Sequence, residues 1–410
     1  MKVLIIGGGI GGLTAALCLH GAGMEVVVCE SVPEIKPLGV GINLLPHSMR
    51  VLSRVGLLER IAEHAVETAE LSYFNKFGQR FWSEPRGQFA GYKWPQFSVH
   101  RGVLQYILFD AVRETLGPDA VRTNHHLDHF EQNDEGVVAH FVDRATGEMI
   151  HEERADLLVG ADGINSVVRQ QLYPDEGPPI YSENVLYRGT TMMPPFLAGN
   201  VMAMIGSMQQ KMVVYPIAKP DVDGRVLTNW VGNLNEGQST LTARDWNREA
   251  DKDRLLDLYK TWQFDWLDVP QMMAGSGKVY EFPMSDRNPL DRWTFGRVTL
   301  LGDAAHPMYP IGSNGASQAI LDADALTRAL TSTTDPLDAL TAYDRERVPA
   351  TAKVVLQNRA KGPDQILDLM EARFPTGFEK HEIPHDELAE VMDHYKRVAG
   401  FDVQSLNQLT

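Results

Sequence analysis

A carboxylate and a set of free backbone N–H groups lie close together in the last third of the chain. Asp303 follows a short run, 298–301, of mostly apolar residues that predicts a buried strand, and Gly302 ends that run. Open α/β sheets bind ligands at the carboxyl ends of their strands, where this carboxylate would lie. Downstream, Gly312 to Gly315 open a long helical run, whose first N–H groups have no partner within the helix. A hydrogen-bond acceptor beside an anion site suits a sugar-linked, electron-rich cofactor.

A glycine-rich turn at the start of the sequence predicts a pyrophosphate site. Gly7, Gly9 and Gly12 form a G-x-G-x-x-G pattern between a predicted strand and a predicted helix. The first glycine permits a tight turn, the second lets the backbone approach a pyrophosphate, and the third lets helix and strand pack closely. A second strand, 25–29, leads to Glu30, whose carboxylate is placed to accept hydrogen bonds from ribose hydroxyls. These elements together predict a βαβ unit that binds a nucleotide.

A third motif lies between the other two. The residues from Ala155 onward predict a buried strand, Asp162 and Gly163 a turn, and the next residues the start of an amphipathic helix. An Asp-Gly pair alone is a common turn. The three motifs together, however, resemble those of the single-component FAD monooxygenases, the flavin-dependent aromatic hydroxylases of the p-hydroxybenzoate hydroxylase family. They span residues 1–320, and therefore most of the chain.

The resemblance implies a role for each motif. The first glycine motif and Glu30 would bind the ADP part of FAD, Asp162 and Gly163 would serve both FAD and a nicotinamide, and Asp303 would hold the ribityl chain. Arg101 resembles the arginine that lies along the phosphate and ribityl region, although it could also be an ordinary surface residue. The FAD-binding residues that the resemblance implies are Gly7, Gly9, Ile10, Gly11, Gly12, Glu30, Gly41, Arg101, Leu127, Asp162, Gly163, Gly302, Asp303, Pro310, Gly315 and Ala316.

Two stretches point to a branch of this family. Residues 41–47 and 302–320 look closest to the phenazine hydroxylases. Many relatives carry Gly-Gln-Gly where this chain has Gly312, Ser313 and Asn314, and the branch does not identify a substrate.

The resemblance also implies the reaction. NADH or NADPH would reduce the flavin, and a flavin C4a-hydroperoxide would then hydroxylate a small aromatic or N-heteroaromatic compound. The protein would exclude water and aim the substrate ring. A second complete dinucleotide fingerprint is missing, because residues 275–277 lack a preceding strand and a third glycine. We therefore expect the nicotinamide to bind only transiently.

Other functions stay open at this point. A related flavoenzyme could be an epoxidase, a reductase or a halogenase, although Trp262 and Trp266 do not fit the halogenase signature. A simple NAD(P) dehydrogenase would not explain the Asp-Gly and Gly-Asp motifs. A non-catalytic flavin-binding module would explain them, and only a test with aromatic compounds would separate it from an enzyme.

The wide separation of the motifs predicts a discontinuous α/β domain of Rossmann type that binds FAD. An inserted α+β substrate domain with a mostly antiparallel sheet, followed by C-terminal helices, fits the strand-rich middle of the chain. Expected strands lie at 184–192, 201–205, 211–217 and 225–231, with a helix at about 248–263. The expected boundaries are 1–70, 98–175 and 290–360 for the FAD domain, 71–97 and 176–289 for the substrate domain, and 361–410 for the C-terminal helical segment.

The substrate contacts are the least determined part of the site. We expect them on the sheet face that covers the flavin, where Arg188 could pair with a substrate carboxylate or pack between the domains. His306 could act as an acid or base, but a structural hydrogen bond is favoured because the motif carries it regardless of substrate. The candidate substrate residues are Tyr187, Arg188, Met204, Tyr215 and Trp230, and no catalytic side chain is assigned.

Composition limits the partners. The 410 residues carry a net charge of −16, which argues against nucleic acid and against an anionic membrane. No leader and no apolar run of bilayer length is evident, so we expect a cytoplasmic protein, either monomer or homodimer. Cys18 and Cys29 are expected to be buried apolar residues, and no metal is expected.

Overall fold

The computed structural model describes residues 1–36, 39–237 and 248–409. A five-stranded parallel sheet forms the base of the first unit, in the order β21-β12-β1-β2-β8. Its inner strands are runs of Val, Ile and Leu that are buried almost throughout, as strands covered on both faces require. The strands are β1 (Lys2–Ile6), β2 (Glu25–Cys29), β8 (Val121–Arg122), β12 (Leu157–Gly160) and β21 (Val298–Leu300).

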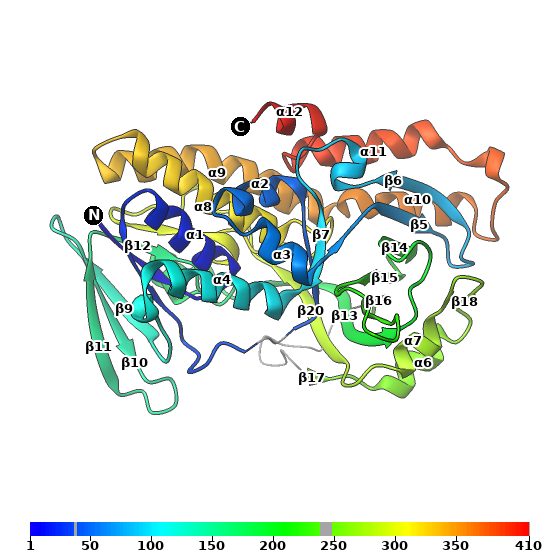
Figure 1. Ribbon diagram of the computed structural model, residues 1–410, viewed down its shortest axis with the longest axis horizontal. Helices are drawn as coiled ribbons and strands as arrows, with labels where there is room; N and C mark the ends of the chain where they lie inside the picture. The colour runs from blue at the N-terminus through cyan, green and yellow to red at the C-terminus, as the bar shows by residue number, and fades with distance from the viewer. Residues whose placement is uncertain (37–38, 238–247, 410) are drawn as a thin grey trace.

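Helices and a small antiparallel sheet surround this parallel sheet (Figure 1). Helix α1 (Ile10–Gly21) packs against both α8 (Gly315–Ser332) and α4 (Arg101–Leu116). The small sheet consists of β9 (His126–Gln132), β10 (Val137–Val142) and β11 (Met149–Ala155), and its apolar side chains share one hydrophobic core with α1 and β1. Further elements of this unit are α2 (Pro46–Arg54), α3 (Leu58–His64), α5 (Val167–Leu172) and α9 (Pro336–Arg359).

The second unit is an eight-stranded sheet in the order β17-β20-β13-β16-β15-β14-β5-β6. All its neighbours are antiparallel except β14 and β5, so the expected mixed architecture with a mostly antiparallel sheet is confirmed. The strands are β5 (Glu70–Phe74), β6 (Arg80–Pro85), β13 (Ile180–Met193), β14 (Val201–Gly206), β15 (Gln210–Pro216), β16 (Val226–Asn235), β17 (Arg248–Glu249) and β20 (Tyr280–Asp286). A third, three-stranded sheet in the order β3-β7-β4 comprises β3 (Gly41–Leu44), β4 (Val66–Glu67) and β7 (Phe97–His100).

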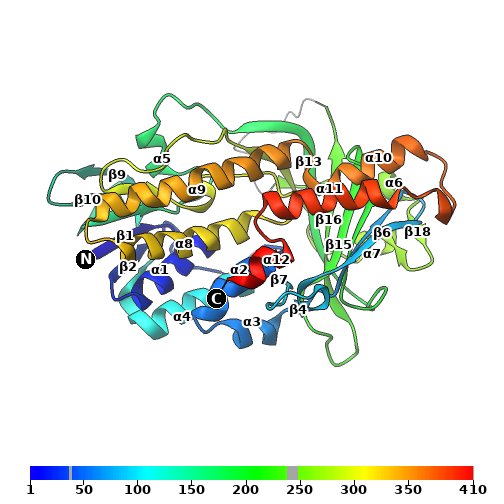
Figure 2. The same ribbon diagram turned by 90° about the horizontal axis from the view of Figure 1, so that it is seen from above.

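Different helices cover the two faces of the eight-stranded sheet. One face packs on α6 (Lys252–Tyr259) and α7 (Val269–Ala274), around Trp230 and Leu255. The other face packs on α10 (Gln365–Arg373) and α11 (His385–Val398), around Met204 and Met392. Figure 2 shows α11 crossing over β15 and β16, with the short α12 (Val403–Gln408) beyond it. The C-terminal helices are therefore part of the covering of the sheet.

The predicted helix at about 248–263 is wrong at both ends. Residues 248–249 form β17, and α6 begins at Lys252 because the Asp251 carboxylate accepts the Arg254 N–H at 3.1 Å as a helix cap. The helix ends at Tyr259, before the short hairpin of β18 (Gln263–Phe264) and β19 (Leu267–Asp268). Within the described ranges, no helix has the length and apolar character needed to cross a membrane.

Candidate active site

The glycine turn after β1 is held by contacts that only glycine permits. Gly7 has a φ of +111°, and a Cβ there would lie 2.4 Å from the Ala161 carbonyl oxygen. A Cβ on Gly12 would lie 2.1 Å from the Gly7 carbonyl oxygen. A Cβ on Gly9, in contrast, would meet no atom within 4 Å. Gly7 and Gly12 therefore serve the fold, whereas Gly9 borders open space beside the start of α1, where a pyrophosphate can approach.

Three helices near this turn begin without a side-chain cap. Gly9 before α1, His100 before α4 and Asn314 before α8 make no capping hydrogen bond, and none of these helices has an acidic residue in its first turn. Their first N–H groups therefore carry uncompensated positive partial charge. Because α1 packs against both of the other helices, this arrangement suits an anionic or electron-rich ligand.

The residues expected around the adenosine part of the cofactor are in different environments. Glu30, at the end of β2, accepts the Gly8 N–H at 2.7 Å, so its carboxylate lies against the glycine turn. Arg101 is exposed at the start of α4. Leu127 is 2% exposed and belongs to the hydrophobic core of the parallel sheet, so its side chain does not line an open site.

Asp162 already has hydrogen-bond partners within the protein. Its carboxylate accepts the hydroxyl of Ser166 at 2.5 Å and the N–H of Val167 at 2.7 Å, at the start of α5. Burial raises the pKa of Asp162, although these hydrogen bonds act in the opposite direction. The next residue, Gly163, has a φ of +79°, which explains the need for glycine in this turn. A role of this pair toward a nicotinamide stays a prediction.

A buried ion-pair network fixes the turn that follows β21. Asp322 of α8 accepts the Gly302 N–H at 3.0 Å, lies 2.6 Å from Nε2 of His306, and accepts Nε–H of Arg347 at 2.7 Å. Burial alone would raise the pKa of Asp322, but the charges and hydrogen bonds of His306 and Arg347 lower it to about 2. The structural role expected for His306 agrees with these contacts.

This network presents Asp303 to solvent. Gly302 and Ala304 on either side of it are buried, whereas Asp303 is exposed. In the part of the chain that the structure describes, its carboxylate has no hydrogen-bond or ion-pair partner. A rigidly held turn with a free carboxylate fits the hydroxyls of a ribityl chain.

The loop between this turn and α8 is tied to the C-terminal helix α11. A Cβ on Gly312 would lie 2.1 Å from the Tyr395 hydroxyl, and Gly312 has a φ of +67°. Ser313 also has a positive φ, of +58°, which costs free energy in a residue other than glycine. The Tyr395 hydroxyl lies 2.8 Å from Asn358 Oδ1 and accepts the Asn314 side-chain amide at 3.0 Å. Pro310 is exposed at the start of this loop.

Strand β3 brings the first unit against the eight-stranded sheet. The Gly41 N–H donates to Asn229 Oδ1 at 2.7 Å, and a Cβ on Gly41 would lie 2.7 Å from both Tyr215 and Ile217. The need for glycine here follows from these neighbours, since protein side chains already fill the space over Gly41. The FAD-binding role that the resemblance implies for Gly41 stays a prediction.

The five candidate substrate residues do not share one face of the sheet. Tyr187 and Trp230 pack against α6 and α7, where the Tyr187 hydroxyl donates to Glu236 at 2.6 Å and the Trp230 indole donates to Ser276 at 2.7 Å. They therefore lie on the face opposite Met204, and their expected place on the flavin side is corrected. Successive side chains of a strand point to opposite faces of the sheet, and the five expected residues include some from each face.

The other three candidates lie toward β3 and the C-terminal helices. Met204 and Tyr215 pack in the core with α10 and α11. The Arg188 guanidinium stands 5.4 Å from the ring centre of Phe282, and its Nε has no hydrogen-bond partner. Burial lowers the pKa of Arg188, with the nearby Tyr215 acting in the opposite direction.

A cavity of about 20 Å³, which has room for about one water molecule, lies between this face of the sheet, the Gly312 loop and α11. It has an apolar wall of Leu and Met side chains and a polar end that the sequence analysis did not identify. Nothing in the local sequence separates these polar residues from surface residues, because β6 and α11 come together only in the folded chain. The lining residues are Leu45, Leu71, Tyr73, Glu84, Arg86, Gln96, Met202, Met204, Gly312, Ser313, Pro363, Met392, Tyr395, Lys396 and Phe401.

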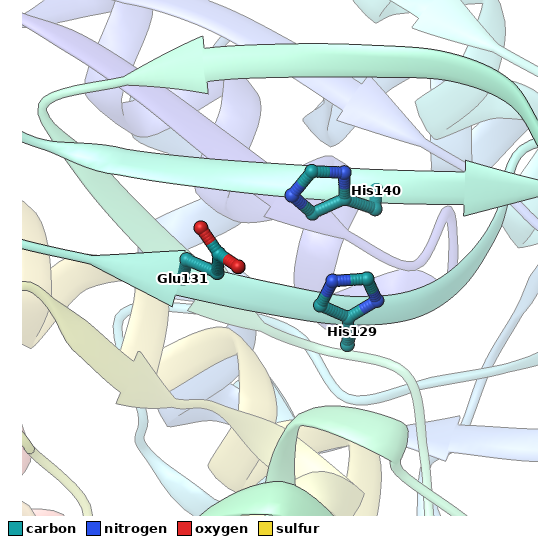
Figure 3. A group of neighbouring side chains, drawn as sticks. All are labelled: His129, Glu131 and His140. Carbon is teal, nitrogen blue, oxygen red and sulfur yellow. The ribbon is translucent and has the colours of Figure 1, made fainter.

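A separate group of possible metal ligands lies on the small antiparallel sheet, and its members do not line this cavity. His129, Glu131 and His140 have ligand atoms within 4.8 Å of one another (Figure 3). The two rings stack with their centres 4.3 Å apart and their planes 8° apart. A histidine nitrogen binds a metal along a lone pair in its ring plane, so stacked rings do not point at one ion without turning. The expected absence of a metal stays a prediction.

The fold and the site define a class of protein. A parallel sheet with a glycine turn, uncapped helix ends and a free carboxylate after its last strand belongs to the dinucleotide-binding oxidoreductases. Within this class, residues 1–358 match the family described as FAD binding domain. The chain therefore belongs to that family, and the resemblance identified from its motifs is confirmed.

Individual relatives define the chemistry more closely. The phenazine 1,6-dicarboxylic acid hydroxylase PhzS of Lysobacter antibioticus is 44% identical over 361 residues, which cover 87% of this chain and 89% of that protein. The 3-hydroxybenzoate 6-hydroxylase 1 of Aquipseudomonas alcaligenes is 33% identical, covering 92% and 95%. The structure of Klebsiella pneumoniae HpxO complexed with FAD and uric acid has the same fold, with a TM-score of 0.77 at 23% identity over 96% of each chain. The chain is an FAD-dependent aromatic monooxygenase.

Proposed function

We propose that this enzyme hydroxylates a small aromatic or N-heteroaromatic compound where the eight-stranded sheet faces the Gly312 loop. The apolar sheet face that meets the loop after the Asp303 turn carries this proposal. The relatives support the substrate class, since one is named for a phenazine dicarboxylic acid and another for a hydroxybenzoate. FAD held by these elements would supply the redox chemistry of hydroxylation, with electrons from NADH or NADPH and with oxygen as the oxidant.

The residues around the glycine turn fit the nucleotide part of FAD. The free N–H groups at the start of α1 and the open space at Gly9 suit the pyrophosphate. Glu30 is placed for ribose hydroxyls, and Arg101 provides a positive charge at the start of α4. The proposal for Leu127 rests on the resemblance alone, because its side chain lies in the core of the parallel sheet.

The residues of the second half of the site fit the ribityl chain and the ring. Asp303 has a free carboxylate for hydroxyl donors, and the network of Asp322 holds its turn in place. The N–H groups of Gly315 and Ala316, at the uncapped start of α8, are available to the electron-rich edge of the ring. The negative charge of FAD would thus lie near the N-terminal ends of helices, and its hydroxyls would donate hydrogen bonds to carboxylates.

The apolar residues of this sheet face exclude water and orient the substrate. Met202, Met204 and Leu71 are each at most 5% exposed, so they offer an apolar surface to one side of a planar ring. Met side chains adapt to the outline of a ligand. Exclusion of water limits the uncoupled loss of reduced oxygen species, and a fixed ring position provides the orientation that hydroxylation requires.

We also propose the division of the chain into an FAD unit (1–70, 98–175 and 290–360), a substrate unit (71–97 and 176–289) and a C-terminal segment (361–410). The position of β5 and β6 in the eight-stranded sheet supports it. We further propose a cytoplasmic enzyme, which its need for NAD(P)H supports, acting as a monomer or a homodimer.

The test is NAD(P)H-dependent oxygen consumption by the purified protein with its bound FAD quantified. Hydroxybenzoates, phenazines, quinolines and pyridines form the panel. We expect one class to speed oxygen consumption and to yield a product with one added oxygen atom. Bound FAD with only slow peroxide formation across the panel would contradict the proposed substrate class and favour a reductase or a non-catalytic flavin protein.

A further inference from the structure

A larger cavity, of about 880 Å³, lies apart from the site described above. It is a groove bordered by α2, α8, α9 and the C-terminal residues around α12, which gather on one side of the molecule in Figure 2. Helix α8 packs against both α2 and α9, so it runs along the middle of the groove. The groove shares no lining residue with the cavity beside the Gly312 loop. Its volume is in the range of about 300–1,000 Å³ that is usual for small-molecule sites.

Three arginines surround one buried carboxylate in this groove. Asp324 of α8, whose side chain is 5% exposed, accepts hydrogen bonds from Arg50 Nη2 at 3.0 Å and from Arg54 Nη1 at 2.8 Å. Arg328 donates to Asp324 at 3.4 Å and to the two carboxylate oxygens of Glu346 at 2.7 and 3.2 Å. All five residues line the groove, and their charges leave an excess of one positive charge.

The two carboxylates are fully engaged, whereas one arginine is not. Both oxygens of Asp324 and both oxygens of Glu346 already accept hydrogen bonds from guanidinium groups. Arg54 is 49% exposed and, among the described residues, donates only through Nη1. Its other N–H groups are therefore open to a ligand. In a chain with a net charge of −16, this end of the groove favours an anion.

The other polar side chains of the groove do not change this charge. Arg347 is 8% exposed, and its Nε–H donates to the buried Asp322 at 2.7 Å, so its charge is balanced behind the wall. His47 is uncharged near neutral pH, because burial lowers its pKa to about 3 and the nearby arginines act in the same direction. Gln318 accepts a hydrogen bond from Arg347 at 2.7 Å. These contacts hold the polar wall in place before any ligand arrives.

The far end of the groove is aliphatic. Gln318 donates to the Ala399 carbonyl oxygen at 3.1 Å, and Ala399 belongs to one apolar cluster with Val354 and Leu406. These residues line the groove together with Leu409, which is 48% exposed at its edge. From Gln318 to Arg328 the groove follows ten residues of α8, about 15 Å at 1.5 Å per residue. An elongated space of this kind suits an extended aliphatic chain.

We propose that this groove binds an aliphatic organic anion, such as a fatty acid or a single-chain lipid phosphate. The anionic group lies at Arg54, and the chain follows α8 toward Leu406 and Leu409. The site is separate from the proposed substrate site, so this inference does not depend on which aromatic compound is hydroxylated.

Both ends of the groove are needed for this assignment. An inorganic anion would satisfy the excess charge at Arg54 but would leave Leu409 exposed to water. An uncharged chain would cover Leu409 but would leave the excess charge without a partner. A ligand that carries one anionic group on an aliphatic chain satisfies both, because burial of apolar area and a charge-assisted hydrogen bond each favour binding.

The test is isothermal titration calorimetry of the FAD-containing enzyme with four probes. Octanoate and octyl phosphate carry both features, octan-1-ol carries only the chain, and acetate carries only the charge. We expect octanoate or octyl phosphate to bind on the order of tenfold more tightly than octan-1-ol and acetate, as expected for a hydrogen bond to a charged group. The comparison of the two anions identifies which head group the site prefers.

Variants of the groove should change the affinities of these probes in different ways. Arg54→Met should remove the advantage of the anions over octan-1-ol, whereas Leu409→Ser should weaken the anions and octan-1-ol alike. Glu346→Gln should strengthen binding of the anions, because it removes a competing negative charge. Arg345→Met, which removes an exposed arginine of α9 that does not line the groove, is the matched control and should change nothing. Bound FAD should be unchanged in all four variants.

Three outcomes would overturn the proposal. The first is that neither anion binds more tightly than octan-1-ol, and the second is that Arg54→Met and Arg345→Met have the same effect. The third is a concentration-dependent dimer in size-exclusion chromatography that both Arg54→Met and Leu409→Ser abolish, which would assign the groove to a second copy of the chain. Oxygen consumption with the aromatic panel tests the proposed function separately, because none of these variants alters a residue of that site.

Discussion

The hydroxyl of Tyr395 occupies the place where a side chain on Gly312 would begin, with 2.1 Å between that oxygen and an added Cβ. A helix near the end of the chain thus fits directly against the loop at the centre of the site. The same hydroxyl meets Asn314 and Asn358, so loop, α9 and α11 share one buried set of hydrogen bonds. The loop has its conformation because α11 is present.

Replacement of Gly312 by alanine should therefore damage both stability and cofactor binding. The added methyl group would displace Tyr395, and the φ of +67° would strain any residue with a Cβ. We expect a loss of about 2 kcal/mol in the free energy of unfolding and weaker retention of FAD. Urea unfolding and FAD titration measure these effects. Gly277→Ala, where a Cβ meets no atom within 4 Å, is the control, and an equal loss there would contradict this explanation.

Two glycines of the first turn should respond differently to the same change. Gly9→Ala has room for its methyl group in the protein, so it should fold normally and bind FAD on the order of tenfold more weakly. Gly12→Ala has no room beside the Gly7 carbonyl and should lose about 1–3 kcal/mol of stability. Unfolding curves and flavin fluorescence titrations of the two variants separate the roles. Similar loss of stability in both would show that Gly9 is structural.

Asp303 should contribute to the affinity for FAD and little to the stability of the fold. Its carboxylate is exposed and has no partner among the described residues, so Asp303→Asn should change the stability of the FAD-free protein by about 0.5 kcal/mol or less. Its affinity for FAD should fall on the order of tenfold, as expected for hydrogen bonds to a charged group. Asp134→Asn, at another exposed aspartate, is the comparison for flavin titration. Unchanged FAD affinity would remove Asp303 from the site.

His47 should make stability depend on pH. Burial, followed by the charges of Arg347 and Arg50, lowers its pKa to about 3, against about 6.5 for an unperturbed histidine. As pH falls, the unfolded chain therefore binds the proton first. The stability that neutral His47 contributes is complete above about pH 6.5 and is lost progressively toward pH 3.

The expected loss between pH 7 and pH 5 is about 2 kcal/mol from this residue. Urea unfolding of the FAD-containing enzyme at both pH values measures it. His47→Leu should flatten the dependence, whereas His64→Leu, at an exposed histidine, should keep it. An unchanged slope in His47→Leu would assign the pH dependence to other groups.

The elements that bind the nucleotide could be predicted because their signals are local. The glycines, the buried strands and the residues that follow them are neighbours in the sequence, and β2 matches the expected 25–29. The strands of the eight-stranded sheet were also close to expectation, since alternating apolar residues and turns mark them.

Which face of that sheet each side chain occupies could not be predicted. Successive side chains of each strand point to opposite faces of the sheet, and Trp230 and Met204 lie on different faces. Which face packs on α6 and which on α11 depends on contacts between segments that are distant in the sequence. For the same reason, the sequence did not indicate that Glu84, Arg86 and Lys396 line one cavity. A charge pattern on β6 or α11 alone looks like a solvated surface, and only their approach in space makes it a cavity wall.

The position of α11 has a consequence for how the enzyme is made. Proteins emerge from the ribosome with their N-terminal parts first and generally fold unit by unit. The glycine turn and the eight-stranded sheet are therefore complete before Met392, Tyr395 and Lys396 are synthesised. Until then, the apolar face around Met202 and Met204 has no cover, and a stalled or shortened chain would expose it to other proteins. The cavity beside the Gly312 loop is closed last, by the same helix that covers the apolar face of the sheet.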